Sequence, residues 1–146
     1  MRHFRRDALP DGTLDHLIEI ASLAPSVGLC EPWRFVVVQD PARRAAIRAN
    51  FERENRSAAH EQAPERRELY ARLKLEGLEA APVQFAVFAE PDPDEGHGLG
   101  RRSMPETTAY SAVMAVHTLW LAARARGIGL GWVSILDPAE VTRSLD

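Results

Sequence analysis

The sequence has a single cysteine, no long apolar run and no surplus of positive charge. The lone Cys30 among 146 residues excludes an internal disulfide framework and is typical of a protein in a reducing cytoplasm. The apolar runs are short and interrupted by charge, so we expect no membrane-spanning segment, and the first residues do not read as a secretory signal. A formal net charge of −3 argues against a general nucleic-acid binder, whose phosphate contacts need a basic surplus.

The sequence also has no obvious cluster of metal ligands. One cysteine cannot form a cysteine-rich site, and the histidines are scattered without a pair at helical or zinc-finger spacing, so we expect no metal site. The histidines are His3, His16, His60, His97 and His117. What is present, 45% hydrophobic and 27% charged residues, is typical of one soluble globular domain spanning residues 1–146.

Amphipathic helical patterns alternate with short runs of β-branched and aromatic residues. The Asp-Pro pairs at 40–41 and 137–138 each combine an N-cap with a first-turn proline, and Ser103 with Glu106 forms a capping box. The helix that ends near Arg126 is apolar on most faces, so we expect it to be central and buried. We expect strands over 33–38, 83–89 and 129–135. We expect a first helix that Asp11 to Thr13 can cap and that ends before Pro25. Further helices are expected from 41, over 69–78, from 103 to about 126, and from 138.

The segment 52–68 has mixed charge and few large apolar residues. Its composition is typical of a solvated helix face, but low apolar content also fits a mobile lid, which would span about 52–75. The three expected strands would leave sheet edges open. The sequence is therefore expected to be cut inside one domain.

Two glycine patterns suggest a nucleotide site, and neither is specific. Gly127, Gly129 and Gly131 alternate, but a dinucleotide fingerprint follows a strand and opens a helix, and here that order is reversed. A tight helix-to-strand turn, or close approach to a flat group, explains them instead. The loop 96–102 has glycines and two arginines but lacks the lysine and hydroxyl of a phosphate loop, which favours a flexible surface loop.

Single side chains also decide little. Neither Ser26 nor Ser134 lies in a recognisable nucleophile elbow with a histidine and an acid. The sequence therefore argues against a serine hydrolase. Ser26 lies between Pro25 and Val27 and is typical of a turn. Tryptophans such as Trp33 and Trp132 are more often core residues than cofactor stackers.

Together, however, several blocks carry a resemblance to a known family. Residues 24–28 (Ala-Pro-Ser-Val-Gly) and 31–35 (Glu-Pro-Trp-Arg-Phe) resemble the flavin-binding segment of the nitroreductase fold. Residues 129–135 (Gly-Leu-Gly-Trp-Val-Ser-Ile) form the most specific block. Further matches follow in the same order, at 70–78, 99–101, 110–111 and 119–125. Over nearly its whole length the chain thus resembles the 5,6-dimethylbenzimidazole synthase (BluB-type) family.

This resemblance implies an α+β, nitroreductase-like, FMN-dependent fold, with a central mixed sheet flanked by helices around a buried long helix. It implies an oxidoreductase that uses reduced FMN as its substrate. Molecular oxygen attacks the reduced flavin, which is broken into 5,6-dimethylbenzimidazole, the lower ligand of vitamin B12, and erythrose 4-phosphate. It further implies a cytoplasmic homodimer that needs no metal and receives reduced FMN from a separate flavin reductase. By the same resemblance, the domain over residues 1–146 is incomplete at both ends.

The resemblance also assigns site residues. Ser134 matches a family serine implicated in ring cleavage and is the predicted catalytic residue. Residues 131–134 would lie along the flavin ring and offer backbone N–H groups to its N5 and O4 atoms. Residues 26–28 would lie against the flavin at the dimer interface. The predicted FMN-binding residues are Arg2, Pro25, Ser26, Val27, Gly28, Pro32, Trp33, Leu99, Gly131, Trp132, Val133 and Ser134.

The N-terminal residues depart from the family pattern. The family begins its flavin site with Arg-Arg-Asp, in which the arginines hold the phosphate and the aspartate is catalytic. Residues 1–4 fit the part that follows this motif, and Arg5-Arg6-Asp7 falls too late in the sequence to replace it. No catalytic role is therefore assigned to Asp7.

Two alternatives to the synthase remain. The first is an NAD(P)H-dependent FMN nitroreductase or flavin reductase of the same fold, which would keep its flavin intact. The second is an inactive, truncated family member, which the missing Arg-Arg-Asp motif favours. The block at 131–135 favours the synthase.

Overall fold

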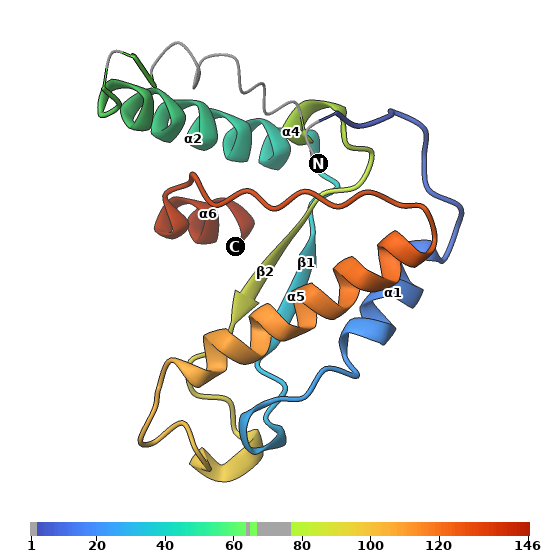
Figure 1. Cartoon of the computed structure of the whole chain (residues 1–146), viewed down its shortest axis with the longest axis vertical. Coiled ribbons are helices and arrows are strands. Elements are labelled where there is room, and N and C mark those ends of the chain that lie inside the picture. The colour runs from blue at the N-terminus through green and yellow to red at the C-terminus, as the bar shows by residue number, and fades with distance from the viewer. Residues whose placement is uncertain (1–2, 64, 67–76) are drawn as a thin grey trace. The chain divides into compact units, whose positions relative to one another are not determined.

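The structure, a computed structural model, describes residues 3–63, 65–66 and 77–146 (Figure 1). The chain divides into two compact units. Unit 1 comprises Met1–Ala8, Val38–Gln84 and Gly131–Asp146, and unit 2 comprises Leu9–Val37 and Phe85–Leu130. Each unit has its own packing and is described by itself. The prediction of one domain over 1–146 stays a prediction.

Unit 2 contains one antiparallel strand pair and two packed helices. Its elements are α1 (Thr13–Ala21), the 3₁₀ turn η1 (Val27–Leu29), β1 (Trp33–Val37), β2 (Phe85–Ala89), the 3₁₀ turn η2 (Glu95–Gly98) and α5 (Thr107–Ala125). Strand β1 pairs antiparallel with β2, and Trp33 lies opposite Ala89. Both strands were predicted, each within two residues of its observed ends.

The core of unit 2 forms where α1 packs on α5 (Figure 1). Leu17 and Ala21 of α1 meet small residues of α5, which let the two helix backbones approach closely. Leu119 is almost fully buried there, and burial of a leucine side chain is worth about 2 kcal/mol. The buried members of this core are Leu17, Ala21, Ala24, Trp33, Ala112, Ala115, Leu119 and Ala123.

The long helix α5 is buried on one side only. Small residues at helical spacing face the core, whereas several large apolar side chains are exposed. The prediction that this helix is buried on most faces is therefore wrong within this chain. The exposed large side chains are Tyr110, Val113, Met114 and Leu121.

Unit 1 is built from α2 (Pro41–His60), α4 (Gly77–Ala80) and α6 (Pro138–Leu145). Both predicted Asp-Pro starts are confirmed. The Asp40 side chain accepts a hydrogen bond from the Arg43 amide, and the Asp137 side chain accepts bonds from the first turn of α6. Ile47, Asn50 and Phe51 form the buried face of α2, which contacts α6.

The third predicted strand is not formed. In the part of the chain that the structure describes, the sheet has two strands, and residues 129–135 are assigned neither helix nor strand. A β-rich run becomes a strand only when a neighbouring backbone accepts and donates its ladder bonds. The composition of this segment cannot supply that partner.

Two predicted helix caps are also wrong. The Ser103 hydroxyl donates to the carbonyl of Gly100 at 3.0 Å, and α5 begins four residues later at Thr107 without a side-chain cap. Helix α1 begins after Gly12, which has a left-handed backbone and likewise no capping side chain. Before α5 the serine hydroxyl bonds a carbonyl of the preceding turn, and before α1 a glycine backbone starts the helix. Neither turn therefore forms the side-chain cap that the sequence indicates.

The predicted lid lies partly outside the described residues. Residues 52–60 belong to α2, as the solvated-helix interpretation predicts. Residues 64 and 67–76 are not described, so the lid over 52–75 and most of the helix over 69–78 stay predictions. Among the described helices, none is long and apolar enough to cross a membrane.

Candidate functional site

In unit 2, the predicted flavin residues gather where η1 meets η2. We call this region the double loop, residues 25–32 and 95–101. Gly28 lies so close to the second loop that a Cβ atom built on it would be 2.9 Å from the Leu99 carbonyl oxygen. Its φ of +55° is also in the left-handed region. The structure therefore brings Val27, Gly28 and Leu99 close together, and their contact with a flavin stays a prediction.

Non-glycine residues of the double loop share this unusual backbone. Leu29, Glu31 and His97 have φ values of +57°, +42° and +46°. For residues with a side chain, such a conformation costs about 1–2 kcal/mol each, and it persists only where surrounding contacts fix it. Strained backbone of this kind concentrates at functional sites, which supports the placement of the site here.

Hydrogen bonds fix the first loop from within. The Val27 amide donates to the Ser111 hydroxyl of α5 at 3.1 Å, and that hydroxyl donates to the Thr107 carbonyl at 2.7 Å. The Glu31 amide donates to the Ser26 hydroxyl at 3.0 Å. The Val27 amide is thus already used inside unit 2, and the Ser26 hydroxyl keeps its own proton and one lone pair for a ligand.

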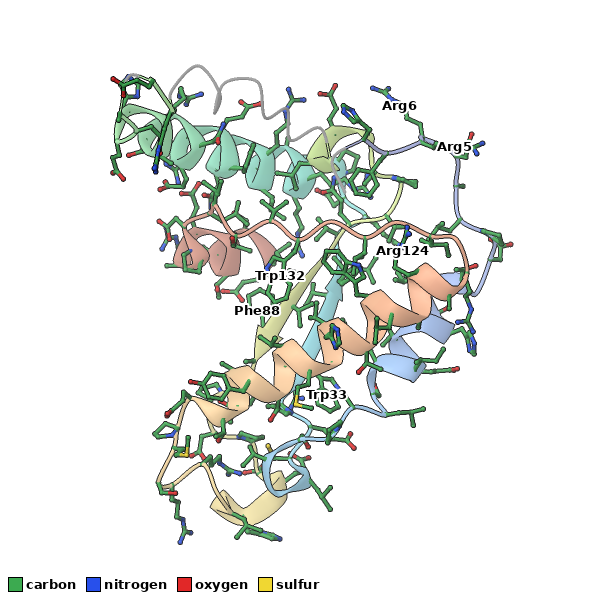
Figure 2. The ribbon with its side chains drawn as sticks, viewed as in Figure 1. Arg5, Arg6, Trp33, Phe88, Arg124 and Trp132 are labelled. Atoms are coloured by element: carbon green, nitrogen blue, oxygen red, sulfur yellow. The ribbon has the colours of Figure 1, made fainter. Side chains whose placement is uncertain are left out.

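The surface of the double loop is apolar in part. Leu29 is 81% exposed and Leu99 71% exposed, which is unusual for leucine and suits contact with a flat apolar group. Pro32 and Trp33 lie inside unit 2, where Trp33 is only 6% exposed (Figure 2). The core interpretation of Trp33 is therefore confirmed, and both side chains support the loop from its interior.

Arg101 ties the second loop together. Its guanidinium donates to the Asp92 carboxylate at 3.0 and 3.1 Å, to the Glu95 carbonyl at 2.9 Å and to the Pro93 carbonyl. This arginine is buried, so the loop 96–102 is anchored and not only a surface loop. An open pocket of about 460 Å³ lies beside it, lined by Pro91, Asp92, His97, Gly98, Arg101, Arg102 and Pro105.

The remaining described site residues lie in unit 1, in residues 131–136, which we call the open segment. Within the described residues of unit 1, none accepts a hydrogen bond from the backbone N–H groups of this segment. Ser134 is exposed, and Trp132 is 54% exposed, so the core interpretation of Trp132 is wrong (Figure 2). The open segment therefore presents unpaired backbone donors next to the predicted catalytic hydroxyl.

Sequence reasoning missed Asn50, which anchors the end of the open segment. Its amide nitrogen donates to the Asp137 carbonyl and its amide oxygen accepts from the Asp137 N–H, both at 2.9 Å. The only signal in the sequence is a polar residue at helical spacing between Ile47 and Phe51, on the apolar face of α2.

The N-terminal arginines of unit 1 are solvated. Arg5 pairs with Asp7 at 2.6 Å, and Arg6 is exposed (Figure 2). Arg2, the predicted phosphate-side residue, lies outside the described residues. In the described ranges, no group of three or more histidine, cysteine, aspartate or glutamate side chains is placed to hold a metal ion.

The available donors and surfaces fit a flavin. The open segment of unit 1 offers N–H groups of the kind that pair with O4 of an isoalloxazine ring and, in the oxidised flavin, with N5. The double loop of unit 2 separately offers exposed leucine side chains for an apolar ring face.

The chain is similar to known proteins over its whole length. Residues 1–146 match a family model described as the nitroreductase family. A 5,6-dimethylbenzimidazole synthase of Rhodospirillum rubrum is 58% identical over 146 residues, which cover 100% of this chain and 69% of that protein.

Solved structures share the fold. Oxidised iodotyrosine deiodinase bound to FMN and 3-iodo-L-tyrosine is similar with a TM-score of 0.79 and 25% identity, over 98% of this chain and 73% of that chain. A BluB-like flavoprotein from Clostridium difficile 630 is similar with a TM-score of 0.72 and 20% identity, over 99% of this chain and 74% of that chain.

Proposed function

The chain belongs to the nitroreductase family, and from this premise we propose that it is a 5,6-dimethylbenzimidazole synthase. Membership confirms the predicted α+β, nitroreductase-like fold. The observation that carries the function is the 58% identity to a synthase of that name across all 146 residues. The reaction we propose is the oxygen-dependent fragmentation of reduced FMN to 5,6-dimethylbenzimidazole and erythrose 4-phosphate.

Reduced FMN, when bound, supplies both the electrons for oxygen and the ring carbons of the product. In unit 1, the backbone N–H groups of the open segment would hold the polar edge of the flavin, because they have no acceptor in the described residues of that unit. Ser134 places a hydroxyl at the same edge, where it can donate or accept a proton during ring cleavage.

In unit 2, the double loop acts through shape more than through hydrogen bonds. Leu29 and Leu99 offer apolar contact, and Gly28 permits the close packing that holds both loops in place. The Ser26 hydroxyl accepts from the Glu31 N–H and keeps one proton to donate and one lone pair to accept. These contacts orient the flavin and exclude water from one of its faces.

The proposed active form is a cytoplasmic homodimer that receives reduced FMN from a separate flavin reductase. The exposed apolar residues of α5 support a self-association surface, because Tyr110, Val113, Met114 and Leu121 are costly to leave in water. A buried, unpaired Cys30 is consistent with a reducing compartment. Sedimentation at micromolar protein concentration should show a dimer, and a stable monomer would contradict this assignment.

The decisive experiment compares two electron routes. Chemically reduced FMN is mixed with the protein and air, and 5,6-dimethylbenzimidazole is measured by mass spectrometry. In parallel, oxidised FMN and NAD(P)H are mixed with the protein, and nicotinamide oxidation is followed by absorbance. The synthase forms product in the first reaction and shows no direct hydride transfer in the second. Turnover of NAD(P)H with intact FMN would instead establish the flavin-reductase alternative.

A further inference from the structure

Asn50 is a buried polar residue that neither helix formation nor core packing requires. Its side chain is 1% exposed and lies between Ile47 and Phe51 on the buried face of α2. An amide in such a position costs free energy unless its donor and acceptor groups are both paired. The residue therefore marks a place where hydrogen bonding matters more than apolar contact.

Both polar groups of Asn50 bind the backbone of one residue. The Nδ2 atom donates to the Asp137 carbonyl and the Oδ1 atom accepts from the Asp137 N–H, each at 2.9 Å. Two such bonds in parallel fix both the position and the orientation of a peptide segment. We call this pair of bonds the Asn50 clamp.

The clamped residue is also the start of a helix. The Oδ1 atom of Asp137 accepts from the amides of Ala139 at 2.9 Å and Glu140 at 3.2 Å. Asp137 is thus held on its backbone by α2 and through its side chain by α6. Backbone that precedes it, the open segment, has no hydrogen bonds of its own within the described residues of unit 1.

Ser134 is three residues before Asp137, so a fixed Asp137 limits where Ser134 can lie. Three residues of extended chain span at most about 10 Å. No other hydrogen bond in the described part of unit 1 holds residues 131–136. The clamp is thus the nearest polar anchor for the predicted catalytic hydroxyl.

Other contacts between α2 and α6 also hold the helix, and the arginine of one of them reaches the clamp. Arg53 pairs with Glu140 at 2.5 Å and donates to the Asn50 Oδ1 atom at 3.4 Å. Arg43 donates to the Leu145 carbonyl at 3.0 Å. Both contacts with α6 are exposed, and that of Arg43 is at the far end of α6. They dock α6, whereas Asn50 fixes the chain that enters it.

We propose that Asn50 is a positioning residue for Ser134, acting through the backbone of Asp137 to hold the open segment against reduced FMN. This inference rests on the proposed synthase function. Loss of the clamp should leave flavin binding largely intact, because the backbone donors remain. It should misplace the Ser134 hydroxyl, so that reduced FMN is oxidised by air without being fragmented.

The test replaces Asn50 and follows the fate of the flavin. For Asn50→Ala we expect the fraction of consumed reduced FMN recovered as 5,6-dimethylbenzimidazole to fall at least about tenfold, with KM changed less than about threefold. Asn50→Asp keeps the volume and the acceptor but turns a carboxylate oxygen toward the Asp137 carbonyl, and it should give a fall of similar size. Arg43→Ala is the matched control, since it weakens α6 docking away from Ser134, and it should keep the wild-type fraction.

A second readout does not depend on the reaction. Hydrogen exchange at the Asp137 amide, measured without flavin, should be faster in Asn50→Ala than in Arg43→Ala. If Asn50→Ala does not fold, Asn50→Asp provides both readouts. Wild-type exchange and a wild-type product fraction in a folded Asn50 variant would overturn the positioning role. Wild-type protein that makes no 5,6-dimethylbenzimidazole at all would overturn the synthase proposal first, and this role with it.

Discussion

The double loop and the open segment reach order in opposite ways. In the double loop, backbone and side-chain groups bind one another, as Val27 binds Ser111 and Arg101 binds the Asp92 carboxylate. In the open segment, the N–H groups have no acceptor in the described residues of unit 1, and order comes from Asn50 at one end. The hydrogen-bonding groups described for the double loop are thus paired within unit 2, whereas the backbone N–H groups of the open segment have no acceptor in the described residues of unit 1.

This difference assigns a rigid surface to the double loop and free hydrogen-bond donors to the open segment. A self-bonded, strained loop provides a rigid surface but few free polar groups, so its mutations should change stability and flavin fit. A segment anchored at its end provides free donors, so its mutations should change the reaction more than the fold. The predictions below follow that division, from the largest expected effect to the smallest.

The largest effect is expected in the open segment. Ser134→Ala should lower kcat for 5,6-dimethylbenzimidazole formation at least about 100-fold, as expected for loss of a group that transfers a proton. FMN affinity should change less than about threefold, because the backbone donors remain. Both values come from product assays and flavin fluorescence titration.

Ser144→Ala is the control for that variant. Ser144 is also in unit 1, where its hydroxyl donates to the Glu140 carbonyl within α6. It should form product at the wild-type rate. Equal rates for Ser134→Ala and wild type would remove Ser134 from the reaction.

The second effect tests the shape of the double loop. Gly28→Ala places a Cβ atom 2.9 Å from the Leu99 carbonyl and forces alanine into a left-handed backbone. The free energy of unfolding should fall by about 3 kcal/mol, from clash and strain together. Gly12→Ala is matched, since Gly12 also has positive φ but no atom within 4 Å, and should cost about 1 kcal/mol. Equal costs in chemical denaturation would show that the loops can separate freely.

The third effect tests the internal hydrogen bonds of the double loop. Ser111→Ala removes the acceptor of the Val27 amide, which should lower the free energy of unfolding by about 2 kcal/mol. Thr118→Ala is the control on the same helix, where the hydroxyl bonds only the Met114 carbonyl, and should stay within about 0.5 kcal/mol. If both variants unfold at the same denaturant concentration, the Ser111 bond does not fix the loop.

The smallest effect is expected for the exposed ion pair in unit 1. A hydrogen bond with Glu140, and a second with Glu54, raise the pKa of Arg53 above its ordinary value. The ion pair would lose its contribution to the free energy of unfolding only as pH rises through this raised pKa. Arg53 should therefore cause no pH dependence of stability between about pH 6 and about pH 9. Arg53→Gln should lower Tm less than Ser111→Ala, and the loss should vanish near 1 M salt. A large, salt-independent loss would mean that this exposed pair contributes more to stability than the hydrogen bonds of the double loop.

The sequence was most informative where a local rule acts alone. The aspartate caps at Asp40 and Asp137 follow from side chains that bind amides two or three residues away, and both were predicted. Strands β1 and β2 follow from runs of apolar residues. Such features need no knowledge of distant residues.

Features that depend on distant partners could not be predicted. A third strand over 129–135 needs a neighbouring backbone, and Ser103 found an acceptor at Gly100 before it could cap a helix. In the sequence, Asn50 is only a polar residue on an apolar helix face. Its role depends on Asp137, which is 87 residues away in sequence and beside it in the fold. The synthase-like block at 129–135 is recognisable from the sequence, but only the fold shows that the N–H groups of the open segment have no acceptor in the described residues of unit 1.

The most direct test of the synthase proposal follows the flavin carbon itself. FMN labelled with carbon-13 in the dimethylbenzene ring is reduced chemically, mixed with one equivalent of protein, and exposed to air. We predict that the label appears in 5,6-dimethylbenzimidazole, with a matching loss of FMN, and that Ser134→Ala returns labelled FMN intact. Complete recovery of intact, reoxidised FMN from the wild-type protein would contradict the account.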